Sequence, residues 1–174
     1  MQPPLHLILN TQDTTQLADT LHQCCASENW VSKMIDSRPF TDTESVFARS
    51  ANIWATLDEG DYLQAFSAHP QIGDIKTLQT KYANTREFAS TEQAKVAQAS
   101  HETIEHLALA NQLYQNRFGF MFIICVTGKS AQEMLEALHL RSNHSTQDEI
   151  RIAAAEQLKI TTLRLMKITN VGSQ

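Results

Sequence analysis

Four short motifs that can open an α-helix recur along this 174-residue chain, and they limit its fold more than any other feature. Residues 41–44 (TDTE), 130–133 (SAQE) and 146–149 (TQDE) fit the pattern Ser/Thr-x-x-Glu, and residues 90–93 (STEQ) fit it with glutamine. In such a capping box, the hydroxyl and the carboxylate or amide satisfy backbone N–H groups that the first turn of a helix leaves unpaired. Helices are therefore predicted to begin at these four points.

Apolar residues at helical spacing extend the same prediction over most of the chain. Leu17, Leu21 and Cys24 mark an early helix, and the spacing between about 91 and 118 predicts a long one. Only five glycines and four prolines interrupt the chain. The sequence therefore predicts an all-α fold: a single compact bundle of roughly eight to nine helices, forming one domain over residues 1–174.

The segment 118–128 (FGFMFIICVTG) does not share this pattern. It is aromatic and β-branched and lies between Gly119 and Gly128, which is typical of a buried strand. No partner strand is evident elsewhere, so an extended segment would carry backbone groups that need other partners, and a polar ligand is one candidate. The alternative is the start of a buried helix, and the pattern alone does not decide between the two.

Composition excludes several classes of partner. The formal net charge is −5, and Lys and Arg form no run, so the surface suits neither nucleic acid nor an anionic membrane. The longest apolar stretch, FMFIICV at 120–126, is far shorter than a membrane span. The first ten residues lack a signal peptide's basic region, and three cysteines do not make a disulfide framework. A cytoplasmic location is expected.

Three motifs suggest chemistry but lack the spacing that the chemistry needs. TGKS at 127–130 has isoleucine where a phosphate-binding loop needs its first glycine. His101 and His106 are five residues apart, about 140° around a helix, so they are poorly placed to share a metal. Cys125 is more typical of a small core residue than of a nucleophile. No metal site is predicted.

Two side chains are harder to assign to structure alone. His69 directly precedes Pro70, which disfavours helical geometry at the residue before it, so the imidazole is expected at a helix end. There it can serve as a cap or as a proton-transfer group near neutral pH. Arg164 lies on an apolar row with Ile160 and Ile168, and it needs either a protein partner or an anionic ligand.

Several stretches, in this order, resemble the 2-oxo-4-hydroxy-4-carboxy-5-ureidoimidazoline (OHCU) decarboxylase family. They are NWVSKMIDSRPF (29–40), AFSAHPQIGD (65–74), STEQAKV (90–96), LYQNRFGFMFIICVTGKSAQEML (113–135) and EQLKITTLRL (156–165). The resemblance covers roughly residues 14–168, and the His-Pro and Arg-Phe-Gly-Phe combination is its most specific part. It implies an all-α enzyme that needs no cofactor and is commonly a homodimer.

The resemblance also implies roles for individual residues. His69 matches the catalytic proton donor, and Glu92 matches a second catalytic residue that meets the substrate. Arg164 matches an arginine that either attracts the substrate anion or braces Glu92. Ala89 stands where the family often has serine, so Ser90 either replaces that hydroxyl or the contact is lost. The other implied substrate-binding residues are Pro70, Thr91, Gln93, Phe122, Ile123, Ile124, Cys125 and Val126.

The implied reaction is decarboxylation of a small ureidoimidazoline, derived from urate, to (S)-allantoin and CO2. The carboxylate of this substrate is next to a carbon–nitrogen double bond that can accept the electron pair of the breaking bond. The substrate thus supplies its own electron sink, a task that a cofactor performs elsewhere. The alternative is a helical ligand-binding or scaffold module of the same fold without catalysis, for which Ala89 is the only support.

Overall fold

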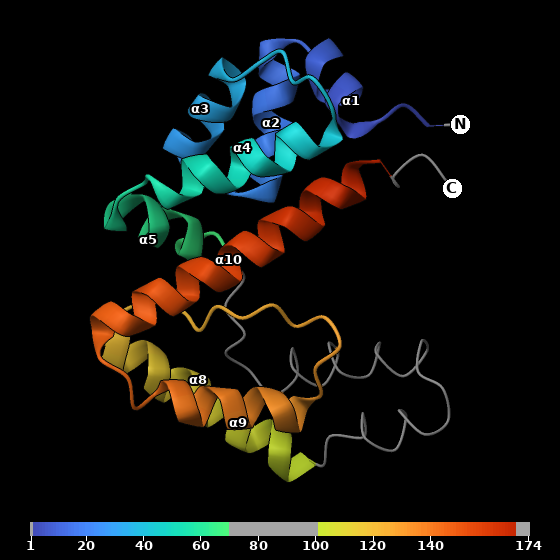
Figure 1. Ribbon diagram of the computed structural model, residues 1–174. Coiled ribbons are helices and arrows are strands. Elements are labelled where there is room, and N and C mark those ends of the chain that lie inside the picture. The colour runs from blue at the N-terminus through green and yellow to red at the C-terminus, as the bar shows by residue number, and fades with distance from the viewer. Residues whose placement is uncertain (1, 70–100, 170–174) are drawn as a thin grey trace. The chain divides into compact units, whose positions relative to one another are not determined.

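The computed structural model describes residues 2–69 and 101–169, and all regular elements in these residues are α-helices (Figure 1). This confirms the all-α prediction, with eight helices in the described part of the chain. None of the helices described is both long enough and apolar enough to cross a membrane. The helices are α1 (Leu5–Thr11), α2 (Thr14–Cys24), α3 (Glu28–Asp36), α4 (Thr43–Ala55), α5 (Glu59–Ser67), α8 (His101–Phe118), α9 (Ala131–Arg141) and α10 (Thr146–Ile168).

The described residues form two compact units. The first contains residues 2–68, 123–125 and 152–169, and the second contains residue 69 and residues 101–122 and 126–151. Helix α10 contributes its first turns to the second unit and the remainder to the first. The expectation of one domain over residues 1–174 stays a prediction.

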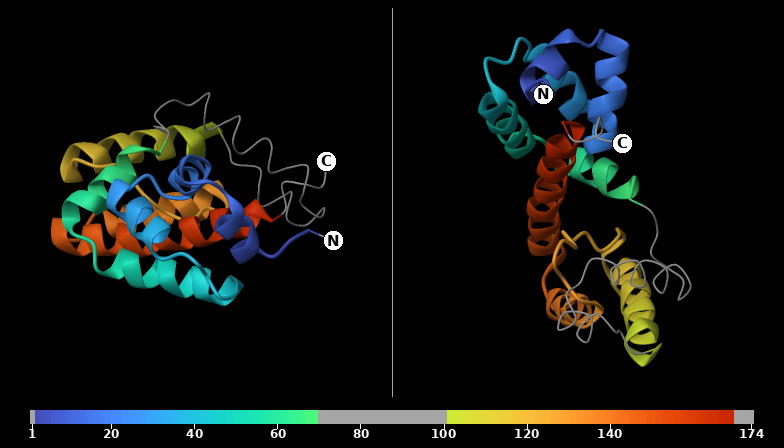
Figure 2. Two further views of the ribbon diagram at one scale, coloured as in Figure 1. Left: turned by 90° about the horizontal axis from the view of Figure 1, so that it is seen from above. Right: turned by 90° about the vertical axis from the view of Figure 1, so that its right-hand side faces the viewer.

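The core of the first unit is built around α3. This helix contacts α2, α4 and α5, and α1 contacts α4. The predicted stripe Leu17, Leu21 and Cys24 of α2 is buried, as is Trp30 of α3. The indole N–H of Trp54 donates to the carbonyl oxygen of Ala154 at 2.9 Å, which joins α4 to the long C-terminal helix. The ribbons of α4 and α10 are drawn in Figures 1 and 2. Burial of Ala154 and Leu165 and this hydrogen bond thus help to hold α10 in the first unit.

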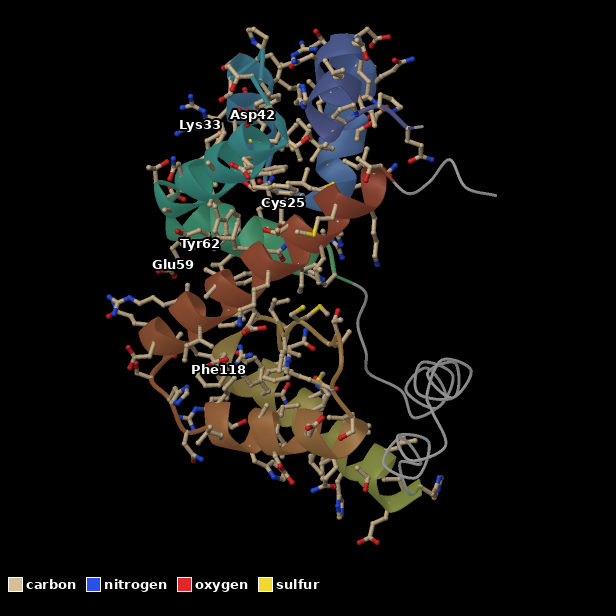
Figure 3. All side chains as sticks on the ribbon, turned by 45° about the vertical axis from the view of Figure 1, so that its right-hand side comes forward. Cys25, Lys33, Asp42, Glu59, Tyr62 and Phe118 are labelled. Atoms are coloured by element: carbon tan, nitrogen blue, oxygen red, sulfur yellow. The ribbon has the colours of Figure 1, made fainter. Side chains whose placement is uncertain are left out.

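The second unit is built on the contact between α8 and α9. Tyr114 and Phe118 of α8 are buried, and their ring centroids lie 4.6 Å apart. Phe118 is labelled in Figure 3. Phe120 and Phe122, which follow the helix, also pack against the Tyr114 ring, with centroids at 5.9 and 5.1 Å. The tilted and edge-to-face geometries are those that aromatic pairs prefer. Four aromatic rings therefore tie the segment after α8 to that helix.

The helix starts agree only in part with the predicted capping boxes. At α9 the prediction is confirmed, because Ser130 Oγ accepts the N–H of Glu133 and the Glu133 carboxylate accepts the N–H of Ser130. The box at 41–44 is wrong by one residue, since Asp42 and Ser45 form it. The box at 146–149 is also wrong, because Ser145 Oγ accepts the N–H of Asp148. The motif at 90–93 lies outside the described residues.

Candidate active site

His69 follows the end of α5 directly. The last residue of that helix is Ser67, and Ala68 caps it, with a backbone N–H directed to the carbonyl oxygens of Ala65 and Phe66. The imidazole is half-buried. The prediction that this histidine lies at a helix end is therefore confirmed, and its role in proton transfer stays a prediction.

Six of the predicted site residues lie outside the described residues: Pro70, Ala89, Ser90, Thr91, Glu92 and Gln93. The roles assigned to them by the family resemblance stay predictions. The remaining candidates are divided between the two units. Arg164 and residues 123–125 belong to the first, and His69, Phe122 and Val126 belong to the second.

Residues 121–126 form a strip without regular secondary structure. The interpretation as the start of a buried helix is therefore wrong, and the segment is not assigned as a regular strand either. The strip lies between Gly119 and Gly128, whose φ angles are +79° and +76°. A Cβ at either glycine would meet no atom within 4 Å, so the left-handed backbone, rather than lack of space, favours glycine there.

Burial along the strip alternates. Ile123 and Cys125 are buried, Phe122 and Ile124 are half-buried, and Val126 is exposed. Alternation with a period of two is what extended backbone produces. Cys125 thus packs as a core residue, as predicted. Because neighbouring side chains point to opposite sides, the backbone conformation at Cys125 also sets the direction of the Ile124 side chain.

The backbone of the strip is held by a side chain that sequence reasoning missed. Glu156 Oε2 accepts the N–H of Cys125 at 2.8 Å, and Glu156 Oε1 accepts from Lys159 Nζ at 2.6 Å. The only available signal was helical spacing, because Glu156 extends the row of Ile160 and Arg164 by one turn. A carboxylate, rather than a partner strand, therefore satisfies this backbone group.

Arg164 has a partner within the protein. One guanidinium nitrogen donates to the carbonyl oxygen of Cys24, the last residue of α2, at 3.3 Å. A cation at a helix C-terminus compensates carbonyl groups that lack helical partners and interacts favourably with the helix dipole. Arg164 is half-buried, and the guanidinium has further donors. The structure thus adds a structural role to the two roles that the resemblance implies.

Cys24 and Cys25, at the end of α2, are both buried, and the charge of Arg164 acts on both thiols. Cys25 is labelled in Figure 3. Burial raises the pKa of Cys24 and of Cys25 to about 11, although the positive charge of Arg164 acts in the opposite direction. Thr161 of α10 also hydrogen-bonds to Cys25 and favours its thiolate. With such pKa values both groups are neutral thiols near pH 7, which does not suit nucleophilic chemistry.

A buried polar network in the second unit surrounds Glu149. This residue was expected in a capping box, but its carboxylate is fully buried and accepts from Tyr114 Oη at 2.5 Å and from Arg141 Nε at 2.6 Å. His144 Nδ1 lies 3.1 Å from the other carboxylate oxygen. Burial is the main reason that the pKa of Tyr114 is raised, and the hydrogen bond to Glu149 raises it further.

The network reaches the strip through Phe122. The Arg141 guanidinium lies over the Phe122 ring, with its central carbon 4.4 Å from the ring centroid, and Tyr114 meets the same ring edge-on. A cation over an aromatic face is attracted to the ring, most strongly where water is excluded. Glu149 therefore orients two side chains that both contact a predicted substrate-binding residue.

The described residues contain no group of three histidine, cysteine, aspartate or glutamate side chains arranged to hold a metal ion. His101 pairs instead with Glu105 on the same helix, with Nε2 and Oε1 3.0 Å apart, and both side chains are largely exposed. At the TGKS motif, residues 127–128 form a turn and Ser130 opens α9. His101 therefore belongs to an exposed helix face and Ser130 to a helix start, which are the structural roles that the spacing of the two motifs favoured.

The described residues belong to an all-α protein in which a histidine follows the end of α5 and an aromatic segment follows α8. The sequence profile of the OHCU decarboxylase family matches residues 10–166, and the chain belongs to this family. The resemblance drawn from the motifs is thus confirmed.

Individual relatives agree with this assignment. A uric acid degradation bifunctional protein of Arabidopsis thaliana is 38% identical over 146 residues, which cover 83% of this chain and 45% of the relative. The 2-oxo-4-hydroxy-4-carboxy-5-ureidoimidazoline decarboxylase of Haloferax volcanii is 28% identical over 158 residues, which cover 90% of this chain and 91% of the relative. The chain thus spans less than half of the Arabidopsis protein but most of the archaeal one.

A crystal structure of OHCU decarboxylase in the presence of (S)-allantoin has the same fold. It is 36% identical to this chain, with a TM-score of 0.71, and the match covers 87% of this chain and 98% of that one. A structure of (S)-allantoin synthase, 17% identical with a TM-score of 0.69, supports the fold alone.

Proposed function

We propose that this protein decarboxylates 2-oxo-4-hydroxy-4-carboxy-5-ureidoimidazoline to (S)-allantoin and CO2 without a cofactor, as a step of urate degradation. The observation that carries the proposal is the family match over residues 10–166, which includes His69 and the whole strip. A relative of similar length, from Haloferax volcanii, has this activity in its name. A homodimer and a cytoplasmic location belong to the same proposal, because the resemblance and the sequence suggest them.

The decarboxylation reaction has three requirements that the protein must meet. It must hold the substrate carboxylate out of the ring plane, so that the breaking bond overlaps the π-system that receives the electrons. It must keep water away from the enol-like intermediate, and it must deliver one proton to one face. The last step fixes the handedness of allantoin, since uncatalysed decay gives both enantiomers.

We assign the proton transfer to His69, whose side chain can titrate near neutral pH. Glu92 would bind the ureido N–H groups by charge-assisted hydrogen bonds. Backbone groups of residues 122–126 would hold the ring amides, and Arg164 would attract the anion or brace Glu92. The N–H of Cys125 donates to Glu156, so we do not assign this group to the substrate.

The test is to supply freshly made substrate, from urate with urate oxidase and hydroxyisourate hydrolase, and to follow optical activity. Rapid formation of one allantoin enantiomer is expected. Slow, racemic decay at the uncatalysed rate would refute the proposal. That result, together with saturable binding of (S)-allantoin, would favour the alternative of a binding module, for which the alanine at position 89 is the support.

A further inference from the structure

The strip at residues 121–126 needs an external support to keep one conformation. It has no regular secondary structure, so its conformation depends on contacts with other parts of the chain. Groups that bind a substrate must be held close to their productive geometry, because a displacement of about 1 Å can reduce the rate on the order of 100-fold. Whatever fixes the strip therefore influences catalysis.

Glu156 has the geometry for this task. Its side chain is only 15% exposed, and it extends from the middle of α10, a 23-residue helix. One carboxylate oxygen accepts the N–H of Cys125 at 2.8 Å, and the other pairs with Lys159, whose own side chain is 62% exposed. The carboxylate thus faces the strip, while its cationic partner lies at the surface.

The position of this bond explains its effect on the neighbouring residues. Ile123 and Cys125 are both buried, and Ile124 between them is half-buried. Fixing the N–H of Cys125 fixes the peptide that joins it to Ile124, and with it the direction of the Ile124 carbonyl group. A charge-assisted hydrogen bond is among the stronger ways to hold a backbone group.

We propose that Glu156 is a positioning residue that holds the strip in its substrate-binding conformation through the N–H of Cys125. The inference rests on the proposed function, because it assumes that the strip meets the substrate. Glu156 itself need not touch the substrate. Its contribution is the order that it imposes on the backbone of residues 123–125.

The contact can be observed separately from activity. The chain has three cysteines, so labelling with ¹⁵N-cysteine gives three backbone amide signals, and Cys125→Ser identifies the relevant one. In Glu156→Ala this signal is expected to shift and its amide proton to exchange faster, while the signals of Cys24 and Cys25 stay in place. An unchanged Cys125 signal would overturn the proposal.

The effect on catalysis is then measured in the optical assay with the full chain. In Glu156→Ala we expect kcat/KM to fall at least about tenfold and the enantiomeric excess of allantoin to drop, since a displaced strip loses orientation. Glu156→Gln keeps an acceptor oxygen and should recover most of both values. Lys159→Gln is the matched control: it removes the cation, leaves the bond to Cys125, and should behave as wild type.

The outcomes separate the two proposals. If wild-type protein gives no enantiomeric excess, the proposed function falls, and this inference falls with it. If wild type is active, and Glu156→Ala moves the Cys125 signal but keeps wild-type kcat/KM and enantiomeric excess, only the positioning role is overturned. Should Glu156→Ala fail to fold, Glu156→Asp, one methylene shorter, is judged by the same two measurements.

Discussion

Glu149→Gln tests the buried network of the second unit most directly, because it removes one charge and keeps the shape of the side chain. In the wild type, the carboxylate accepts from both Tyr114 and Arg141, and the Arg141 side chain is only 7% exposed. Glutamine offers one acceptor oxygen and a new NH2 group. The guanidinium of Arg141 therefore stays buried without its counter-charge, while the NH2 group of glutamine takes the place of the oxygen that faces His144 Nδ1.

The expected loss of stability is large for one substitution. Breaking a buried ion pair by removing one partner costs about 3–5 kcal/mol, because an uncompensated charge is left inside. Total stabilities are about 5–15 kcal/mol, so a substantial part would be lost. For a chain of this length, each kcal/mol lowers the melting temperature by about 2–4 °C, which gives a decrease of about 6–20 °C.

The assay is urea and thermal unfolding followed by circular dichroism, with Glu136→Gln as the matched control. Glu136 is an exposed glutamate on α9, so its neutralisation should change stability by less than about 0.5 kcal/mol. A triple variant, Tyr114→Phe with Arg141→Met and Glu149→Leu, removes the three buried members of the network and should be more stable than Glu149→Gln. Equal unfolding midpoints for Glu149→Gln and Glu136→Gln would refute the argument.

Three shorter predictions follow from the helix ends and the candidate site. His69→Asn should keep the fold by circular dichroism but lose stereospecific turnover on the order of 10²–10⁴-fold, and full activity would remove the histidine from the mechanism. Ser130→Ala removes the N-cap of α9 and should lower the free energy of unfolding, measured in urea, by about 1 kcal/mol. Ser130→Asn should retain most of the wild-type stability. Gly119→Ala should lower the free energy of unfolding by about 1 kcal/mol, because φ is +79° at this residue. An unchanged midpoint of urea unfolding would contradict this prediction.

Sequence reasoning succeeded where the determining interactions are local. The stripe of Leu17, Leu21 and Cys24 and the box of Ser130 with Glu133 each depend on residues within two helical turns. The two boxes that were displaced have a physical reason. In each case an adjacent pair of residues could serve as the cap, and the better capping residue did so: Asp42 instead of Thr41 at α4, and Ser145 instead of Thr146 at α10.

Sequence reasoning failed where partners are distant along the chain. Glu149 bonds to Tyr114, 35 residues away, and Glu156 bonds to the backbone of Cys125, 31 residues away. A glutamate within a helix is usually solvated, so neither position carries a local sign of burial. The need for a partner was visible in the strip, whose unpaired backbone was predicted to require polar contacts. Which side chain would meet that need depends on tertiary packing.

The buried thiols of the first unit predict how stability changes at alkaline pH. Burial raises the pKa of Cys24 and Cys25 from 9.0 to about 11. The stability that comes from keeping both thiols neutral in the folded state is therefore fully present below about pH 9 and is lost as the pH rises toward 11. At about pH 10.5 the loss is about 2 kcal/mol for each thiol, because the unfolded chain ionises while the folded one does not.

The double variant Cys24→Ala, Cys25→Ala removes both titrating groups and should lose less stability between about pH 8 and pH 10.5 than wild type. Urea unfolding at the two pH values measures this difference, and the cavities left by alanine cancel because each protein is compared with itself. Tyrosines and lysines titrate equally in both proteins, so the difference belongs to the thiols. If both proteins lose the same stability, burial does not hold these thiols in their neutral form.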